Sequence, residues 1–292
     1  MTQGIFLPLN FNSLWYLGLS TLSLILLFYV YFKTKNYRSL LLFLGMVGIG
    51  YSIEYIIYVL LGSYEYDPNI ISRDAYYDNN MGALASNLLT LPATATLIAV
   101  FRLNWIVIAI ITGLIVGIEW LFLKLGIYRH YWWRFEYTAF GLLVYYGFAK
   151  AWFTRLMRPL KGISHSLTLY FITWALCTMQ FVPISLFNSR YYNLGWFENR
   201  SHDTTAFSSL FGMFTSIFSV WVLKLKWKYS WLKYIFSAAV IFGVNIILQI
   251  IGVLHSLVWW DFWYCSGVNL IIIIIVDVIS KRLWNGPNQL LR

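Results

Sequence analysis

The sequence predicts an all-α, polytopic transmembrane bundle. Of the 292 residues, 60% are hydrophobic, 20% are aromatic and only 11% are charged. Apolar stretches of about 20 residues, the length that a helix needs to cross a bilayer, recur along the whole chain. Water-soluble domains do not repeat such stretches, so the composition argues against a soluble enzyme or a nucleic-acid-binding domain.

Nine transmembrane spans follow from these stretches and their polar flanks. The first stretch lacks the basic leading segment and the small-residue cleavage site of a secretory signal, so we expect it to be a retained helix. Cys177 and Cys265 fall within or near spans, which predicts free thiols rather than a disulfide. The expected spans are residues 14–32, 39–61, 80–101, 104–125, 135–154, 166–187, 206–226, 232–254 and 262–280.

Basic residues predict the orientation of these spans. With the N-terminus outside and the C-terminus in the cytoplasm, every connection on the cytoplasmic side is cationic. Together, the cytoplasmic segments carry 15 of the 21 lysines and arginines. Cytoplasmic loops of membrane proteins show this bias. Lys224, Lys226, Lys228 and Lys233 flank a short aromatic turn on that side, which suits anionic lipid headgroups. The net charge of +10 therefore indicates a membrane partner rather than a nucleic acid.

The chain roughly overlays itself at an offset of 126 to 127 residues, with Gly117 on Gly243 and Gly126 on Gly252. Helical hairpins of uniform length give similar spacings, so the prediction of a repeat depends on several residue types matching together. Each copy holds four spans, and an even number of crossings gives both copies the same orientation. The predicted parts are an N-terminal extra helix with its basic loop (1–38), a first parallel repeat (39–161) and a second repeat with the cytoplasmic tail (162–292).

Three glutamates lie within or at the edge of spans in the first copy. Glu54 and Glu119 are about 10–12 Å below the outer ends of their helices, at 1.5 Å of rise per residue, and Glu136 is in the first turn of its span. A carboxylate at that depth is costly if it faces lipid, so we expect each to face the bundle or a hydrated cavity. The second copy carries Gln180 and Asn245 in place of the first two.

Arg129, His130 and Arg134 border this polar layer in the connection between the fourth and fifth spans. They can pair with Glu119 or Glu136, and His130 can move a proton near neutral pH. A single histidine at an interface is also commonly a hydrogen-bonded surface group. Because the Glu119, His130 and Glu136 spacing matches no metal-binding motif, we expect neither a metal site nor a cofactor.

Other residues near the span ends have structural interpretations. Tyr128, Trp132 and Trp133 gather at a predicted outer boundary, where aromatic side chains commonly anchor a protein in the membrane interface. Lys150 and Asp277 occupy corresponding positions near the cytoplasmic side. We predict that these two residues form a structural salt bridge across the pseudo-axis.

Three segments carry a resemblance to a known group of proteins: Asp78 to Ala83 (DNNMGA), Ile118-Glu119, and Leu125 to Trp133 (LGIYRHYWW). The stretch that contains them resembles uncharacterised small multi-pass membrane proteins of Bacillus and other endospore-forming Firmicutes. It covers about a quarter of the chain, and the second copy departs from it at Asn245. The resemblance implies a bacterial plasma membrane and supplies no activity.

Three classes of function stay open. We favour transport or sensing of a cation or small polar solute through an outward-facing polar cavity, with Glu54 and Glu119 as proton or cation sites. The alternative is a membrane-embedded enzyme acting on an outer-leaflet lipid or isoprenoid headgroup, with Glu119 or Glu136 as general acid or base and His130 as partner. A scaffold protein, in which the acids only pair with arginines, is the third. Because the sequence has no soluble-enzyme motif, no catalytic residue is assigned.

Overall fold

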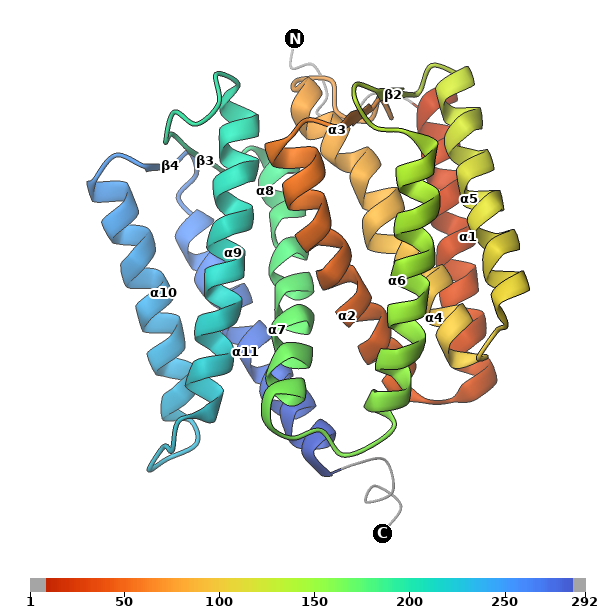
Figure 1. The fold of residues 1–292 in the computed structure, drawn as a ribbon. Coiled ribbons are helices and arrows are strands. Elements are labelled where there is room, and N and C mark those ends of the chain that lie inside the picture. Colours follow the sequence, from red (N-terminus) through yellow and green to blue (C-terminus); the bar gives the residue numbers. More distant parts are fainter. Residues whose placement is uncertain (1–8, 286–292) are drawn as a thin grey trace. The chain divides into compact units, whose positions relative to one another are not determined.

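The computed structural model describes residues 9–285, and the chain forms two compact units, Met1–Arg158 (unit 1) and Pro159–Arg292 (unit 2). Both units are bundles of long helices, each with one small two-stranded sheet (Figure 1). The prediction of an all-α fold is therefore confirmed.

Unit 1 packs α2, α4 and α6 against one another, with α1 against α4 and α5 against α6. A hydrogen bond from the Tyr145 hydroxyl to the Met46 carbonyl oxygen, 2.8 Å long, ties α6 to α2. The elements of unit 1 are α1 (Phe11–Thr34), α2 (Tyr37–Glu54), the π-helix η1 (Tyr55–Leu60), β1 (Tyr64–Tyr66), α3 (Ala75–Ala83), the π-helix η2 (Leu84–Thr90), α4 (Leu91–Val100), α5 (Trp105–Lys124), β2 (Tyr128–His130) and α6 (Phe135–Leu156).

Unit 2 packs α7 against α9 and α11, and α10 against α11 and α9. Its elements are α7 (Gly162–Met179), α8 (Phe181–Phe187), β3 (Arg190–Tyr192), α9 (Arg200–Lys224), α10 (Leu232–Ile250), β4 (Leu254–Ser256) and α11 (Asp261–Asn285).

Polar caps mark where the apolar helices begin. The side chains of Asn10, Asn36, Asn104 and Asn199 each accept a hydrogen bond from a backbone N–H in the first turn of α1, α2, α5 and α9. Such caps satisfy amide groups that have no partner within the helix. The local sequence therefore specifies these helix starts independently of tertiary packing.

Eight helices within residues 9–285 are long and apolar enough to cross a membrane, so the chain has the architecture of a multi-pass membrane protein. Large apolar side chains on their outer faces, such as Ile25, Ile110 and Ile247, are exposed in the bundle, as a lipid environment requires. The eight are Phe11–Thr34, Tyr37–Leu60, Ala75–Val100, Trp105–Lys124, Gly162–Phe187, Arg200–Lys224, Leu232–Ile250 and Asp261–Asn285.

The ninth expected span, 135–154, is helix α6, which does not belong to this set of eight. It carries the charged residues Glu136, Lys150 and Arg155. Its 22 residues nevertheless pack against α2, α4 and α5.

Two helices change to π geometry at places where the sequence predicts uninterrupted spans. α2 continues as η1 directly after Glu54, and η2 joins α3 to α4. The Thr90 hydroxyl donates to the Ala85 carbonyl oxygen five residues earlier, and Pro92, in the first turn of α4, has no N–H to donate. π-turns widen a helix locally and are often found at functional sites.

The two small sheets correspond in position, although the sequence analysis predicts no strand. β1 pairs with β2 and β3 pairs with β4, both antiparallel. Each residue of β1 and β2 lies 126 positions before its counterpart in β3 and β4, for example Tyr64 before Arg190. Strands of three residues are too short for an alternating pattern to stand out within polar connections.

An aspartate fixes the loop after the first strand of each sheet. The Asp78 carboxylate accepts hydrogen bonds from three consecutive backbone N–H groups, those of residues 69–71. The Asp203 carboxylate accepts from those of residues 194–196 in the same way. These contacts hold the loop after the strand against the helix that follows it.

Lys150 and Asp277, which the sequence predicts to pair with each other, each have a partner within their own unit. Asp277 pairs instead with Lys233 at 2.6 Å and Lys281 at 2.7 Å, and the Lys150 ammonium donates to the Leu103 carbonyl oxygen at 2.6 Å. The same contacts correct the interpretation of Lys233, which is buried in an ion pair and does not face lipid headgroups.

Candidate functional site

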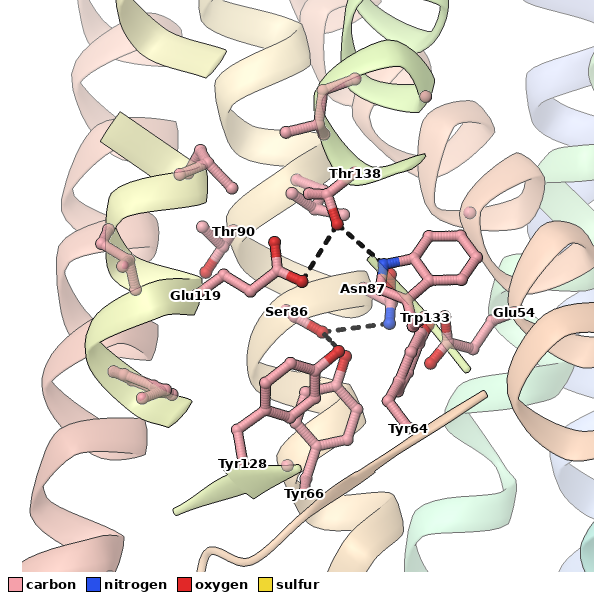
Figure 2. A pocket seen from close by; sticks show the side chains of 18 of the residues that line it. Glu54, Tyr64, Tyr66, Ser86, Asn87, Thr90, Glu119, Tyr128, Trp133 and Thr138 are labelled. Atoms are coloured by element: carbon pink, nitrogen blue, oxygen red, sulfur yellow. Dashed lines mark hydrogen bonds between the residues drawn. The ribbon is translucent and has the colours of Figure 1, made fainter. Parts of the chain in front are cut away.

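A cavity of about 210 Å³ lies within unit 1. Residues of α2, η2, α5 and α6 form most of its wall, and β1 and β2 add three tyrosines (Figure 2). The lining is mainly apolar, with a few polar groups, which is the usual composition of a small-molecule site. The polar side chains are Tyr16, Glu54, Tyr64, Tyr66, Ser86, Asn87, Thr90, Glu119, Tyr128, Trp133, Tyr137, Thr138 and Tyr145.

Glu54 enters the cavity from the end of α2, where the helix changes to π geometry. The residue is only 5% exposed, and its Oε2 accepts a hydrogen bond of 2.6 Å from the Tyr64 hydroxyl. Burial, and then the neighbouring Glu54 charge, raise the pKa of Tyr64 well above its ordinary value, so this hydroxyl keeps its proton and donates. Oε1 makes no hydrogen bond of ordinary geometry within residues 9–285, although the Asn87 side chain lies beside the carboxylate.

Glu119 enters the cavity from α5. Its Oε1 accepts hydrogen bonds from His130 Nε2 at 2.8 Å and from the Thr138 hydroxyl at 3.0 Å. Its Oε2 is buried and has no hydrogen-bond partner within residues 9–285. Because the side chain is only 9% exposed, this oxygen is a strong acceptor that the described protein leaves open.

His130 supports Glu119 from β2, outside the residues that line the cavity. Its ring packs edge-on against Tyr128 and Phe135, with centroid distances of 5.1 and 5.4 Å. Burial lowers the pKa of His130 below its ordinary value, which favours the neutral imidazole. A neutral imidazole protonated at Nε2 donates to the Glu119 carboxylate without cancelling its charge.

Aromatic rings form a continuous cluster beside the two carboxylates. The Tyr66 and Tyr128 centroids are 4.9 Å apart, and Tyr64 lies 5.5 Å from both Tyr128 and Trp133. A Cβ atom on Gly82 would lie only 2.3 Å from Tyr66 Cβ, so glycine is required for α3 to approach β1 this closely. The sheet, rather than the helices, brings the three tyrosine rings to the cavity.

The charge of this cavity is unbalanced. Two carboxylates line it, and its described lining contains no lysine, arginine or histidine. A buried charge without a counter-charge is unstable in a medium of low dielectric constant. The arrangement therefore suits protonation or the binding of a cation from outside the chain.

Three of the predicted site residues lie apart from the cavity. Arg129 is exposed and is 4.0 Å from both Glu65 and Asp67. It points outward because side chains alternate along a strand and those of residues 128 and 130 point inward. Arg134 and Glu136, at the start of α6, are exposed and do not line the cavity.

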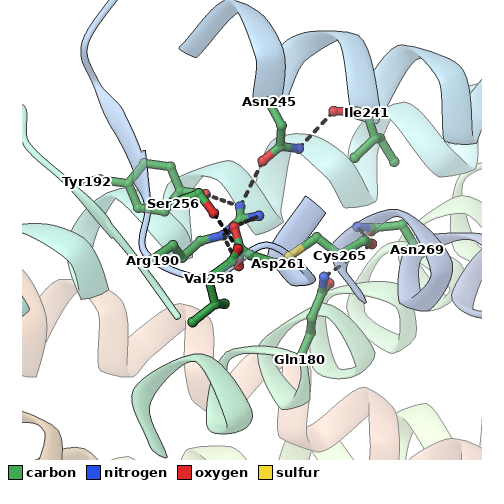
Figure 3. A network of polar contacts seen from close by, with 10 residues as sticks. All are labelled: Gln180, Arg190, Tyr192, Ile241, Asn245, Ser256, Val258, Asp261, Cys265 and Asn269. Carbon is green, nitrogen blue, oxygen red and sulfur yellow. Dashed lines mark hydrogen bonds and ion pairs between the residues drawn. The ribbon is translucent and has the colours of Figure 1, made fainter. Parts of the chain in front are cut away.

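Gln180 and Asn245 lie in unit 2, beside a smaller pocket of about 50 Å³. Asn245 Oδ1 accepts a hydrogen bond of 2.7 Å from Arg190, and Gln180 Nε2 donates to the Cys265 carbonyl oxygen at 3.3 Å. Arg190 also forms an ion pair of 2.8 Å with Asp261 (Figure 3). Of the eight predicted residues, three therefore belong to the unit 1 cavity or support it (Glu54, Glu119 and His130), two lie in unit 2 (Gln180 and Asn245), and three lie at neither place.

The sequence did not predict most of the other residues that line the unit 1 cavity and the unit 2 pocket. Tyr128 and Trp133, interpreted as membrane-interface anchors, line the unit 1 cavity instead. The alternation of Tyr64, Glu65 and Tyr66 was an available signal, since it places both tyrosines on one face of a strand.

No protein-family model matches the chain, and no curated protein or solved structure is detectably similar to it.

Proposed function

We propose that this chain is a bacterial plasma-membrane protein that binds a small cation in the unit 1 cavity, as a step in its transport or sensing. The observation that carries the proposal is the pair of buried carboxylates, Glu54 and Glu119, in a cavity whose described lining has no basic side chain. Glu119 Oε2 has no hydrogen-bond partner within residues 9–285. A bound cation would supply both the missing counter-charge and the missing donor.

Protons compete with the cation in this scheme. When no cation is bound, protonation of a carboxyl group removes the cost of the unbalanced buried charge. Cation binding then releases that proton, which is the elementary step of cation–proton exchange. A sensor uses the same step to detect a cation at the membrane surface.

The proposed orientation has the N-terminus outside, α6 as a ninth span and the cavity in the outer half of the membrane. The distribution of basic residues supports it, because 15 of 21 lie on the side assigned to the cytoplasm. The resemblance of residues 78–155 to Bacillus membrane proteins supports a bacterial plasma membrane.

We also propose that the two units descend from one four-span ancestor and are parallel repeats. The 126-residue offset between the sheets and the equivalent aspartate contacts with residues 69–71 and 194–196 support this origin. Another shared contact fixes the strands: Asn79 Oδ1 accepts from the Tyr66 N–H, and the Thr204 hydroxyl oxygen accepts from the Tyr192 N–H.

An enzyme acting on a lipid headgroup is the second candidate, favoured by the 2.8 Å contact between His130 and Glu119. Pairs of this kind serve as general acid and base. In this arrangement, however, His130 stands behind Glu119 and is not part of the cavity lining. It orients the carboxylate and does not reach a bound molecule.

Ligand-induced stabilisation of the purified protein in detergent tests the proposal. The thermal midpoint is measured with chloride salts of inorganic and organic cations, and with uncharged polar solutes, for the wild type, Glu119→Gln and Glu136→Gln. We expect a cation to raise the midpoint of the wild type and of Glu136→Gln, whose changed residue is exposed and outside the cavity, and to leave Glu119→Gln unchanged. Equal responses of all three proteins would contradict a cation site at Glu119.

A further inference from the structure

In unit 2, the guanidinium group of Arg190 occupies a position comparable to that of the cavity in unit 1. The Arg190 side chain is 2% exposed and pairs with Asp261 through Nε at 2.9 Å and Nη2 at 2.8 Å. Nη1 donates to Asn245 at 2.7 Å and to the Tyr192 hydroxyl at 2.9 Å. The guanidinium carbon also lies 6.0 and 5.8 Å from the ring centroids of Tyr192 and Phe262. Carboxylate, amide and aromatic groups thus surround a buried guanidinium.

Two of the groups that hold this guanidinium, Asn245 and Tyr192, have counterparts that line the unit 1 cavity, whereas the residue 126 positions before Asp261 is Phe135, which does not line it. Asn245 lies 126 residues after Glu119, and Tyr192 lies 126 residues after Tyr66. Both counterparts line the cavity. Arg190 itself lies 126 residues after Tyr64, at the same position of its strand. Unit 1 therefore has its own acids, Glu54 and Glu119, and aromatic side chains at this place, and it lacks the arginine that unit 2 has there.

The size of the two spaces agrees with this difference. The pocket beside Arg190 has about 50 Å³, whereas the cavity in unit 1 has about 210 Å³. A protein cavity of about 150 Å³ is large enough for benzene. The unit 1 cavity consequently has room for a small organic cation.

From this comparison we infer that the unit 1 cavity binds an organic ammonium or guanidinium group, with Glu119 and Glu54 as its counter-charges and the Tyr64, Tyr66 and Tyr128 rings around its apolar part. This inference rests on the proposed function and names its ligand class. Organic cations bind well where carboxylates and aromatic faces occur together. Bare Ca²⁺ takes six to eight oxygen ligands, and no cluster of three or more metal-ligating side chains occurs in the described residues.

Such a group has two sources, a dissolved amine or the amino headgroup of a lipid. Ile53 and Tyr137 line the cavity, yet they are 48% and 45% exposed, so the wall is thin on the outer surface of α2 and α6. An organic cation that enters from water and one that enters from the lipid headgroup layer would make the same contacts with Glu119 and Glu54. The two sources differ only in which added compound stabilises the protein.

The test uses full-length protein and two substitutions that fill the cavity. Tyr64→Arg places an arginine where unit 2 has Arg190, within reach of the Glu54 carboxylate that Tyr64 contacts now. Gly141→Leu adds volume at a lining position where a Cβ meets no atom within 4 Å. Gly117→Leu is the matched control, because that helical glycine is equally uncrowded but does not line the cavity.

Binding of methylguanidinium, methylammonium, Na⁺ and K⁺ is measured by calorimetry in detergent. In the lipid arm, thermal midpoints are compared in nanodiscs of phosphatidylglycerol with and without phosphatidylethanolamine. We expect an organic cation or the ethanolamine lipid to bind wild type and Gly117→Leu, and Glu119→Gln to weaken that binding by about tenfold or more. Tyr64→Arg and Gly141→Leu should abolish binding while keeping a cooperative thermal transition.

The outcomes separate the ligand class from the proposed function. A response to free amines identifies a dissolved ligand, and a response only to phosphatidylethanolamine identifies a headgroup, and both support the inference. Binding of Na⁺ or K⁺ alone, abolished by Glu119→Gln, overturns the organic-cation inference and preserves a cation site. Organic-cation binding that survives both Tyr64→Arg and Gly141→Leu overturns the inference as well, because the site then lies elsewhere. Failure of every cation and of the ethanolamine lipid overturns both proposals.

Discussion

The cavity in unit 1 and the Arg190 site in unit 2 both contain buried carboxylates, and the two places differ in whether the chain supplies a counter-charge. Both lie beside a sheet of the same register, and both bring acidic, amide and aromatic side chains together. Unit 2 balances the Asp261 carboxylate with its own arginine. Unit 1 has two carboxylates and no basic side chain among its described lining residues. In unit 2 the charge is balanced within the chain, whereas in unit 1 we propose that a bound cation supplies the balance.

Breaking the ion pair in unit 2 should have the largest effect. Replacing Asp261 by Asn leaves the buried Arg190 guanidinium without a counter-charge, and loss of one member of such a pair costs about 3–5 kcal/mol. We expect the free energy of unfolding of unit 2 to fall by that amount, measured by denaturation in mild detergent. Glu65→Gln, which removes one partner of exposed Arg129 in unit 1, is the control and should have an effect below about 1 kcal/mol. Similar losses in both variants would show that the Arg190 pair is not critical.

Crowding the approach of α3 to β1 should have the next largest effect. Gly82→Ala places a Cβ 2.3 Å from Tyr66 Cβ, and the strand must shift. Overpacking of this kind costs about 1–3 kcal/mol, and it should also displace the tyrosines that line the cavity. Thermal unfolding compares it with Gly141→Ala, whose new Cβ meets open space. An unchanged midpoint in Gly82→Ala would contradict the close packing of this sheet.

Removing the Tyr64 hydroxyl should have a moderate effect. Tyr64→Phe keeps the ring in the aromatic cluster and deletes the 2.6 Å hydrogen bond to Glu54. Hydrogen bonds to charged groups contribute about 1.5–3 kcal/mol, and part of that is recovered if Glu54 takes up a proton. We expect a loss of about 1 kcal/mol by chemical denaturation. Tyr131→Phe, which deletes an exposed contact with Glu65, should lose less.

The pH dependence contributed by His130 should be the smallest of these effects. Burial lowers the pKa of His130 below its ordinary value of 6.5, so the unfolded chain binds a proton more readily than the folded one. This contribution to stability is therefore complete above pH 6.5 and is lost as the pH falls below 6.5 and through the lower pKa of the folded state. Comparing wild type with His130→Gln between pH 7.5 and pH 5.5 measures it. If the two proteins show the same slope, His130 makes no such contribution.

The difference between the units also shows what the sequence can predict. Long apolar stretches and their polar flanks predicted the helices, because local composition decides whether a segment suits lipid. The cost of a charge in lipid gave a physical reason to select Glu54 and Glu119, and both line one cavity. Their neighbours in space were not predictable in this way, because three-residue strands and π-turns depend on contacts between distant segments.

Arg190 illustrates this limit most clearly. In the sequence it is one of six basic residues assigned to the outside, and its connection looks like an ordinary polar loop. Only the pairing of β3 with β4 places it between Asp261 and Asn245. The same applies to Tyr64, whose role follows from its position in β1.

The number of methylguanidinium or methylammonium ions bound per chain tests the central claim most directly. If the unit 1 cavity is open and Arg190 fills its counterpart in unit 2, calorimetry should find one site per chain in the wild type and none in Tyr64→Arg. Two equivalent sites in the wild type, or one site that persists in Tyr64→Arg, would contradict the account.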